Sequence, residues 1–171
     1  MSIAHLYGYC VLSGLCVNIH AMPWTRGEKY LATSFVIGVC HHIDHVLRYD
    51  HSGRPFRPEV TPFTYSLLVY PIFLIAALSR RYPLLRIAAT ALLFGFTTFA
   101  HFYFETPFDQ YRTWAEGSPV PLHGIQHTLL NTESRTAGIL AATITVLLSL
   151  FLGLALWQFT LQWRRGEGGP K

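Results

Sequence analysis

The chain has 171 residues, of which 51% are hydrophobic and only 13% are charged. Charged residues usually make up about a quarter of a soluble domain, so this composition favours a membrane protein. The net charge of +4 comes from basic residues that lie in short groups between apolar runs, so no nucleic-acid-binding surface is expected. The odd number of cysteines, three, argues against a disulfide framework.

Apolar segments predict an all-α polytopic membrane helix bundle with four or five transmembrane helices, since about 20 mostly apolar residues cross a bilayer. Residues 3–19 are uncharged and contain small residues, so they form either a fifth membrane helix or a helix at the interface. Pro71 predicts a kink in the segment of residues 63–79. The remaining apolar segments are residues 31–47, 63–79, 84–104 and 136–163.

We expect residues 1–163 to form a single membrane-embedded helical domain and residues 164–171 to form a disordered basic tail. The first apolar run lacks a basic stretch before it, so no cleavable signal peptide is expected. If the helices alternate in direction, the face that receives the C-terminus carries eight basic residues and the other face carries five. The positive-inside rule then places the C-terminus in the cytoplasm. The expected location of the protein is the cytoplasmic (inner) membrane.

Histidines gather at the end of the segment 31–47, within the sequence "GVCHHIDHVLRYDHSGRPF". His41 and His45 are four residues apart and share one side of a helix, and His42 and His45 are three residues apart and share a neighbouring side. Ionisable residues at membrane depth usually face the interior of a bundle or a cavity. The cluster therefore predicts one wall of a polar site.

The alternating topology brings further ligand-type residues to the same membrane face. The segment 84–104 ends there with His101 and Glu105, which are again four residues apart. The connection from residue 105 to 135 also lies at this face and contains "PLHGIQHTLLN", in which His123 and His127 share one side if the stretch is helical. Three pairs are therefore expected to lie close together at this membrane face: His41 with His45, His101 with Glu105, and His123 with His127.

Imidazole and carboxylate groups together suit iron, zinc, manganese or copper. Asp44 is expected either to orient a ligand imidazole or to form an ion pair with Arg48, and Asp109 is either a ligand or a loop cap. In a zinc site Glu105 could act as a catalytic general base rather than as a ligand. Seven candidates exceed the needs of one zinc, which favours two metals or a mixture of ligands and supporting groups. The candidate ligands are His41, His42, His45, His101, Glu105, His123 and His127.

These histidine clusters resemble the histidine boxes of membrane fatty-acid desaturases and hydroxylases in residue type and in their place at helix ends. The order differs, because "HHIDH" reads HHxxH and the other pairs read HxxxE and HxxxH, whereas that family has an HxxxH-type box and two HxxHH-type boxes. The chain is also short for that family. No residue role is carried over from the resemblance.

Three functions follow as hypotheses. The first is a membrane-bound metalloenzyme, with one or two irons that activate dioxygen or with a zinc that activates water, acting on a lipid or other apolar substrate. The second is a b-type haem electron-transfer protein with axial ligands such as His45 and His101. The third is a non-catalytic accessory subunit or metal-binding membrane protein. The expected partners are the lipid bilayer, an apolar small molecule, and a second copy of the chain or a larger membrane complex.

Overall fold

The computed structural model describes residues 23–48, 62–117, 128–130 and 132–167. Within these ranges the chain forms helices and no strands, so the expected all-α fold is confirmed. The elements in order are α1 (Arg26–Leu47), α2 (Pro62–Ser66), α3 (Val69–Leu78), the 3₁₀ helix η1 (Ser79–Arg81), α4 (Pro83–Tyr103), α5 (Pro107–Glu116) and α6 (Arg135–Arg164).

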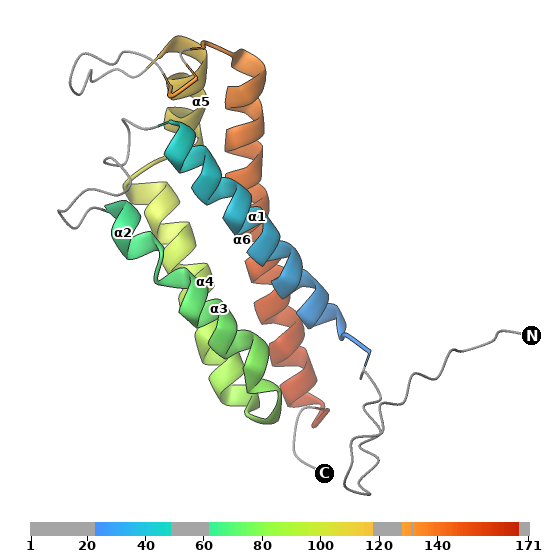
Figure 1. Cartoon of the computed structure of the whole chain (residues 1–171). Coiled ribbons are helices and arrows are strands. Elements are labelled where there is room, and N and C mark those ends of the chain that lie inside the picture. Colours follow the sequence, from blue (N-terminus) through green and yellow to red (C-terminus); the bar gives the residue numbers. More distant parts are fainter. Residues whose placement is uncertain (1–22, 49–61, 118–127, 131, 168–171) are drawn as a thin grey trace, which may run out of the picture.

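The long helices run lengthwise beside one another in an elongated bundle (Figure 1). Helix α6 packs against α1, α4 and α5, and α3 packs against α4. The end of α1, the end of α4, all of α5 and the start of α6 meet at one end of the bundle, which is uppermost in Figure 1 and is called the upper end below. The turn at η1, the start of α1 and the end of α6 lie at the opposite, lower end.

Three segments are long and apolar enough to cross a membrane: Phe63–Arg81, Pro83–Tyr103 and Arg135–Arg164. They coincide with three of the predicted spans, so a membrane-integrated bundle is supported by length and composition. Large apolar side chains on these helices face outward, as expected where the surrounding solvent is lipid; examples are Leu74, Leu92, Phe99, Val146 and Trp157. Helix α1 is not among the three, and residues 3–19 lie outside the described residues, so four or five spans are not established.

Helix α1 begins earlier than its apolar run because its first turn is capped. The Thr25 hydroxyl accepts a hydrogen bond from the Glu28 amide, and the Glu28 carboxylate accepts one from the Thr25 amide, which together form a capping box. Its buried residues recur at helical spacing and face α6; they include Leu31, Ser34, Gly38, His41 and His45. The polar end of α1 is therefore turned into the bundle.

The segment with Pro71 is interrupted, in line with the predicted kink. Helix α2 ends at Ser66, and residues Leu67 and Leu68 form a turn before α3 begins. Proline has no amide hydrogen, so Pro71 cannot donate to the carbonyl of Leu67, and the helix loses a bond at this point. The interruption leaves Ser66 close to the histidine-bearing part of α1, as described below.

Helix α5 was expected only as part of a connection. It begins with Pro107 at its first position and a capping box between Thr106 and Asp109. Asp109 thus caps the start of this helix, although the sequence predicted only a cap within a loop. Close packing of α5 on α6 depends on Gly138, because a Cβ atom there would lie 2.7 Å from the backbone oxygen of Tyr111.

An ionic cluster fixes the lower end of the bundle. The Glu28 carboxylate forms an ion pair with Arg80, whose Nε lies 2.8 Å from Oε1, and it accepts a hydrogen bond from Arg86 at 3.0 Å. The Arg86 guanidinium also donates to the carbonyl of Ala76 and lies 4.7 Å from the ring centre of Phe159. These contacts hold the start of α1 against the turn between α3 and α4 and against α6.

Candidate functional site

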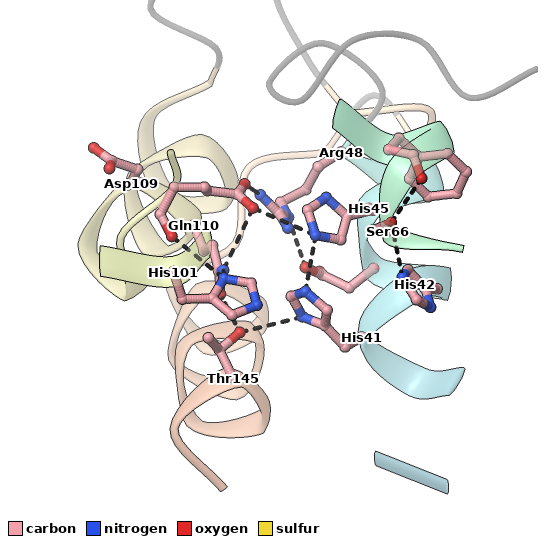
Figure 2. Close-up of polar contacts among 12 residues, drawn as sticks. His41, His42, His45, Arg48, Ser66, His101, Asp109, Gln110 and Thr145 are labelled. Carbon is pink, nitrogen blue, oxygen red and sulfur yellow. Dashed lines mark hydrogen bonds and ion pairs between the residues drawn. The ribbon is translucent and has the colours of Figure 1, made fainter. Parts of the chain in front are cut away.

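A cluster of buried polar side chains occupies the upper end of the bundle (Figure 2). They come from α1 and its C-cap, from the end of α4, from α5 and from α6, and none exposes more than 9% of its surface. Polar groups are buried in this number only when they bond to one another. This polar cluster consists of His41, Asp44, His45, Arg48, His101, Glu105, Gln110, Trp114 and Thr145.

His41 and His45 face each other across one turn of α1. Their Nε2 atoms are 2.8 Å apart, so one nitrogen carries a hydrogen and the other accepts it. The hydroxyl of Thr145 donates to the side-chain oxygen of Gln110 at 2.6 Å and lies 3.2 Å from Nδ1 of His41. Because that hydroxyl hydrogen is used, Nδ1–H of His41 donates to Thr145, and the lone pair of His41 Nε2 points toward His45.

The Glu105 carboxylate adjoins this histidine pair. Its Oε2 lies 3.4 Å from Nε2 of His45 and 3.5 Å from the side-chain nitrogen of Gln110, and its Oε1 accepts a hydrogen bond from Arg48. Glu105 follows α4 directly, where the chain turns toward α5. Two imidazole nitrogens and one carboxylate oxygen therefore meet at the junction of α1, α4 and α5.

Arg48 joins both buried carboxylates. Its Nε donates to Asp44 at 2.6 Å, and the second oxygen of Asp44 accepts a 2.7 Å hydrogen bond from the indole of Trp114. The ion pair is thus the role of Asp44 that the structure shows. Burial alone would lower the pKa of Arg48, but the two carboxylates outweigh it and raise that pKa above its usual range. With the imidazoles neutral, Asp44, Glu105 and Arg48 leave a net charge of −1 in the cluster.

His101 lies edge-on against His41, with ring centres 4.6 Å apart. Its Nδ1 is 3.4 Å from both the backbone oxygen of Glu105 and the side-chain nitrogen of Gln110. Its Nε2 makes no hydrogen bond to another described residue. His101 therefore belongs to the same cluster and retains a ring nitrogen for a ligand.

His42 has different surroundings, although it is the immediate neighbour of His41. Its Nδ1 lies 2.7 Å from the hydroxyl of Tyr70, and its Nε2 lies 3.0 Å from the hydroxyl of Ser66. Both ring nitrogens are therefore used in bonds that hold α1 to α2 and α3. In this arrangement neither nitrogen is left for a metal.

His123 and His127 lie outside the described residues. The chain that follows them is described at Thr128–Leu130, where it forms a turn rather than a helix. The amide of Leu129 donates to the carbonyl of Leu47 at 2.8 Å, so this part of the chain reaches the end of α1.

Several residues of the site were not recognised in the sequence. Gln110 and Trp114 lie on a helix that was not predicted, and Thr145 lies in the most apolar segment of the chain. The sequence "TPFD", with proline after a possible N-cap and aspartate at the third helical position, is a signal that could have revealed α5. No comparable signal distinguishes Thr145 from the other threonines of α6, because its role depends on lateral packing.

A cavity of about 510 Å³ adjoins the polar cluster. Its polar lining includes His41, His45, His101 and Glu105, and its apolar walls come mainly from α2, α3 and α4. Ligand pockets usually occupy about 300–1,000 Å³ and combine apolar walls with a few polar groups. The size and composition of this cavity suit a small or single-chain apolar ligand.

The donor set at the cluster fits a divalent metal in its chemistry. Two histidines with one carboxylate bind catalytic zinc in some proteases and ferrous iron in many oxygenases. The net charge of −1 also favours a cation. As the side chains stand, however, no three His, Cys, Asp or Glu residues within the described ranges could hold one ion together. Two nitrogens on one tetrahedral zinc lie about 3.4 Å apart, so the 2.8 Å separation of His41 and His45 would have to widen.

No protein-family model matches the chain, and comparisons with curated proteins and with solved structures find no match. The resemblance to membrane desaturases and hydroxylases therefore gains no support from them. Function is inferred below from the chemistry of the polar cluster and of the cavity beside it.

Proposed function

We propose that the protein is a membrane-embedded metalloenzyme that acts on a lipid or other apolar substrate. The observation that carries the proposal is the lining of the cavity: imidazoles and a carboxylate at one end, and apolar side chains over the rest. In the proposal His41, His45 and Glu105 bind one zinc or iron ion, and His101 is a further ligand. The proposal also makes α1 a fourth membrane span and places the C-terminus on the cytoplasmic side of an inner membrane.

The protein's own groups would prepare the site in three ways. Thr145 fixes the His41 ring so that the lone pair of its Nε2 points toward His45. For both nitrogens to bind one ion, the hydrogen on His45 Nε2 would have to move to its Nδ1 and the two rings would have to separate. Arg48 balances the charge of Asp44 and holds one oxygen of Glu105, leaving the other oxygen toward His45. The apolar walls exclude water from the substrate. A bound ion would supply Lewis acidity and would activate water or dioxygen at this end of the cavity.

His42 is assigned a packing role in this proposal, since Tyr70 and Ser66 occupy its nitrogens. It provides a matched control for the ligand histidines because it lies on the same helix and is equally buried. Metal content is measured by mass spectrometry on the detergent-purified protein, with an absorption spectrum of the same sample. We expect about one zinc or iron per chain, at least a tenfold loss in His45→Ala and Glu105→Gln, and retention in His42→Ala.

Turnover is tested separately. The metal-loaded protein is reconstituted in vesicles, and the extracted lipids are examined by mass spectrometry. We expect a converted lipid that the His45→Ala protein does not form. A Soret absorption band would instead identify a haem protein, and purified protein without stoichiometric metal would refute the metalloenzyme. Bound metal with no converted lipid would support the non-catalytic alternative.

A further inference from the structure

We propose that the cavity binds a single lipid acyl chain from one leaflet, with its polar head end at His41, His45 and Glu105 and its methyl end toward the bilayer centre. This inference rests on the proposed function, whose substrate class it narrows. In this orientation the head end of the lipid is the end that reacts. A bound metal would not by itself determine which end that is.

The length of the cavity matches one leaflet. Its lining on α4 extends from Leu92 to His101, which is nine residues or about 14 Å at the helical rise. Leu92 lies near the midpoint of α4, and His101 lies near its upper end. The hydrocarbon core of a bilayer is about 30 Å thick, so one leaflet contributes about 15 Å. If α4 crosses the membrane, the cavity therefore runs from one face to the middle of the bilayer.

The polarity of the walls changes along this length. The histidines, Glu105 and Ser66 lie at the upper end, and Thr97, one turn below His101, is the last polar side chain in the α4 wall. The deeper walls are apolar and include Val69, Ile72, Phe73, Leu92 and Leu148. An ester group placed among these side chains would lose its hydrogen bonds to water without replacement, which costs several kcal/mol. The head end therefore belongs at the polar cluster.

The cavity is open toward the surface that faces lipid. Leu68, Leu92 and Phe104 line it and are also 58%, 56% and 61% exposed. Leu68 lies between α2 and α3, and Leu92 lies on α4. These two parts of the cavity opening therefore belong to segments that are apolar enough to cross a membrane. A chain can therefore enter sideways from the bilayer without passing through water.

Photo-crosslinking of the full-length purified protein tests the orientation. Two methyl stearates, whose ester head is uncharged, are used, one with a diazirine near the ester end and one with a diazirine near the methyl end, and the crosslinked residues are mapped by mass spectrometry. We expect the first probe to label the end of α1 and residues 101–105, and the second to label residues 69–73 and the neighbourhood of Leu148. The same label positions for both probes, or the reverse pattern, would overturn the inference.

Gly38 supplies the matched variants, because it lines the cavity and, among the described residues, a Cβ atom there meets only Leu148, at 3.8 Å. Gly38→Leu should lower crosslinking by both probes at least fivefold, whereas Gly38→Ala should change it less than twofold. Val69→Phe fills the cavity from α3 and is used if Gly38→Leu fails to fold. Unchanged labelling in a folded cavity-filling variant would also overturn the inference. Oriented labelling of a protein without metal would refute only the proposed enzyme, and bound metal without labelling would refute only this inference.

Discussion

At the scale of single residues, Arg48 is the cation that pairs with two buried carboxylates. It is 1% exposed and is paired with Asp44 and Glu105, both also buried. Replacing it with Met would leave two buried carboxylates without their cation, which costs about 3–5 kcal/mol. We therefore expect Arg48→Met to unfold at a much lower SDS fraction than the wild-type protein, measured by far-ultraviolet circular dichroism in mixed micelles.

The control for Arg48 is Arg112, which forms an exposed ion pair with Glu116 on α5. Exposed pairs contribute at most about 1 kcal/mol, so Arg112→Met should unfold close to wild type. Adding Glu105→Gln to Arg48→Met removes one of the two uncompensated charges and should restore part of the lost stability. Equal effects of the two arginine substitutions would contradict the buried network.

Thr145 is the residue that orients His41. Thr145→Val keeps the side-chain shape but removes the acceptor for His41 Nδ1–H and the donor to Gln110. Loss of such a partner usually lowers metal affinity by about 10–100-fold, and we expect an effect of that size in chelator competition with zinc. Thr143→Val is the control, because Thr143 lies two residues earlier on α6 and is exposed, and among the described residues its hydroxyl bonds to the carbonyl of Ile139 alone. Unchanged zinc affinity in folded Thr145→Val would show that Thr145 does not orient His41 for metal binding.

At the scale of elements, the position of α5 depends on one close contact with α6. A Cβ atom at Gly138 would lie 2.7 Å from the Tyr111 carbonyl oxygen, and a backbone atom cannot move aside without moving its helix. We expect Gly138→Ala to destabilise the protein by about 1–3 kcal/mol and to weaken the Trp114–Asp44 hydrogen bond, seen as a shift in the tryptophan emission.

Gly95 provides the comparison for Gly138, since it is also within a helix and a Cβ atom there meets no described residue within 4 Å. Gly95→Ala should leave stability unchanged or raise it by about 0.5–1 kcal/mol, because alanine restricts the unfolded chain. If both alanine variants behaved alike, the close approach of α5 to α6 would not be needed for the fold.

At the scale of the whole molecule, the bundle was predictable from the sequence because long apolar segments have few other stable arrangements. Alternation of the helices also placed His41, His45, His101 and Glu105 at one end, where the structure brings them together. The lateral partners were not predictable, because the contact between Thr145 and His41 depends on how α6 rotates against α1. Helix α5 was missed because its composition is polar and only its capping signal marks it.

Whether the described part of the chain has three spans or four depends on α1, whose polar side chains face inward. Its outward residues from Thr33 to Ile43 are uncharged and include Phe35, Val36 and Cys40, so lipid can surround it despite its histidines. If α1 crosses the membrane, Lys29 lies on the same side as the other lower-end groups, and Arg112 lies on the opposite side.

Single cysteines test this topology in intact cells. In a background with the native cysteines replaced by serine, Lys29→Cys, Arg81→Cys, Arg164→Cys and Arg112→Cys are treated with a membrane-impermeant maleimide. We expect only Arg112→Cys to react from outside and the other three to react after lysis, which would also place the C-terminus in the cytoplasm. If Arg112→Cys reacted only after lysis while the other three variants reacted from outside, the orientation would be reversed and α1 would still cross the membrane. Reaction of Lys29→Cys on the same side as Arg112→Cys would show that α1 does not cross, and the histidine cluster would then lie at the end of a three-span bundle.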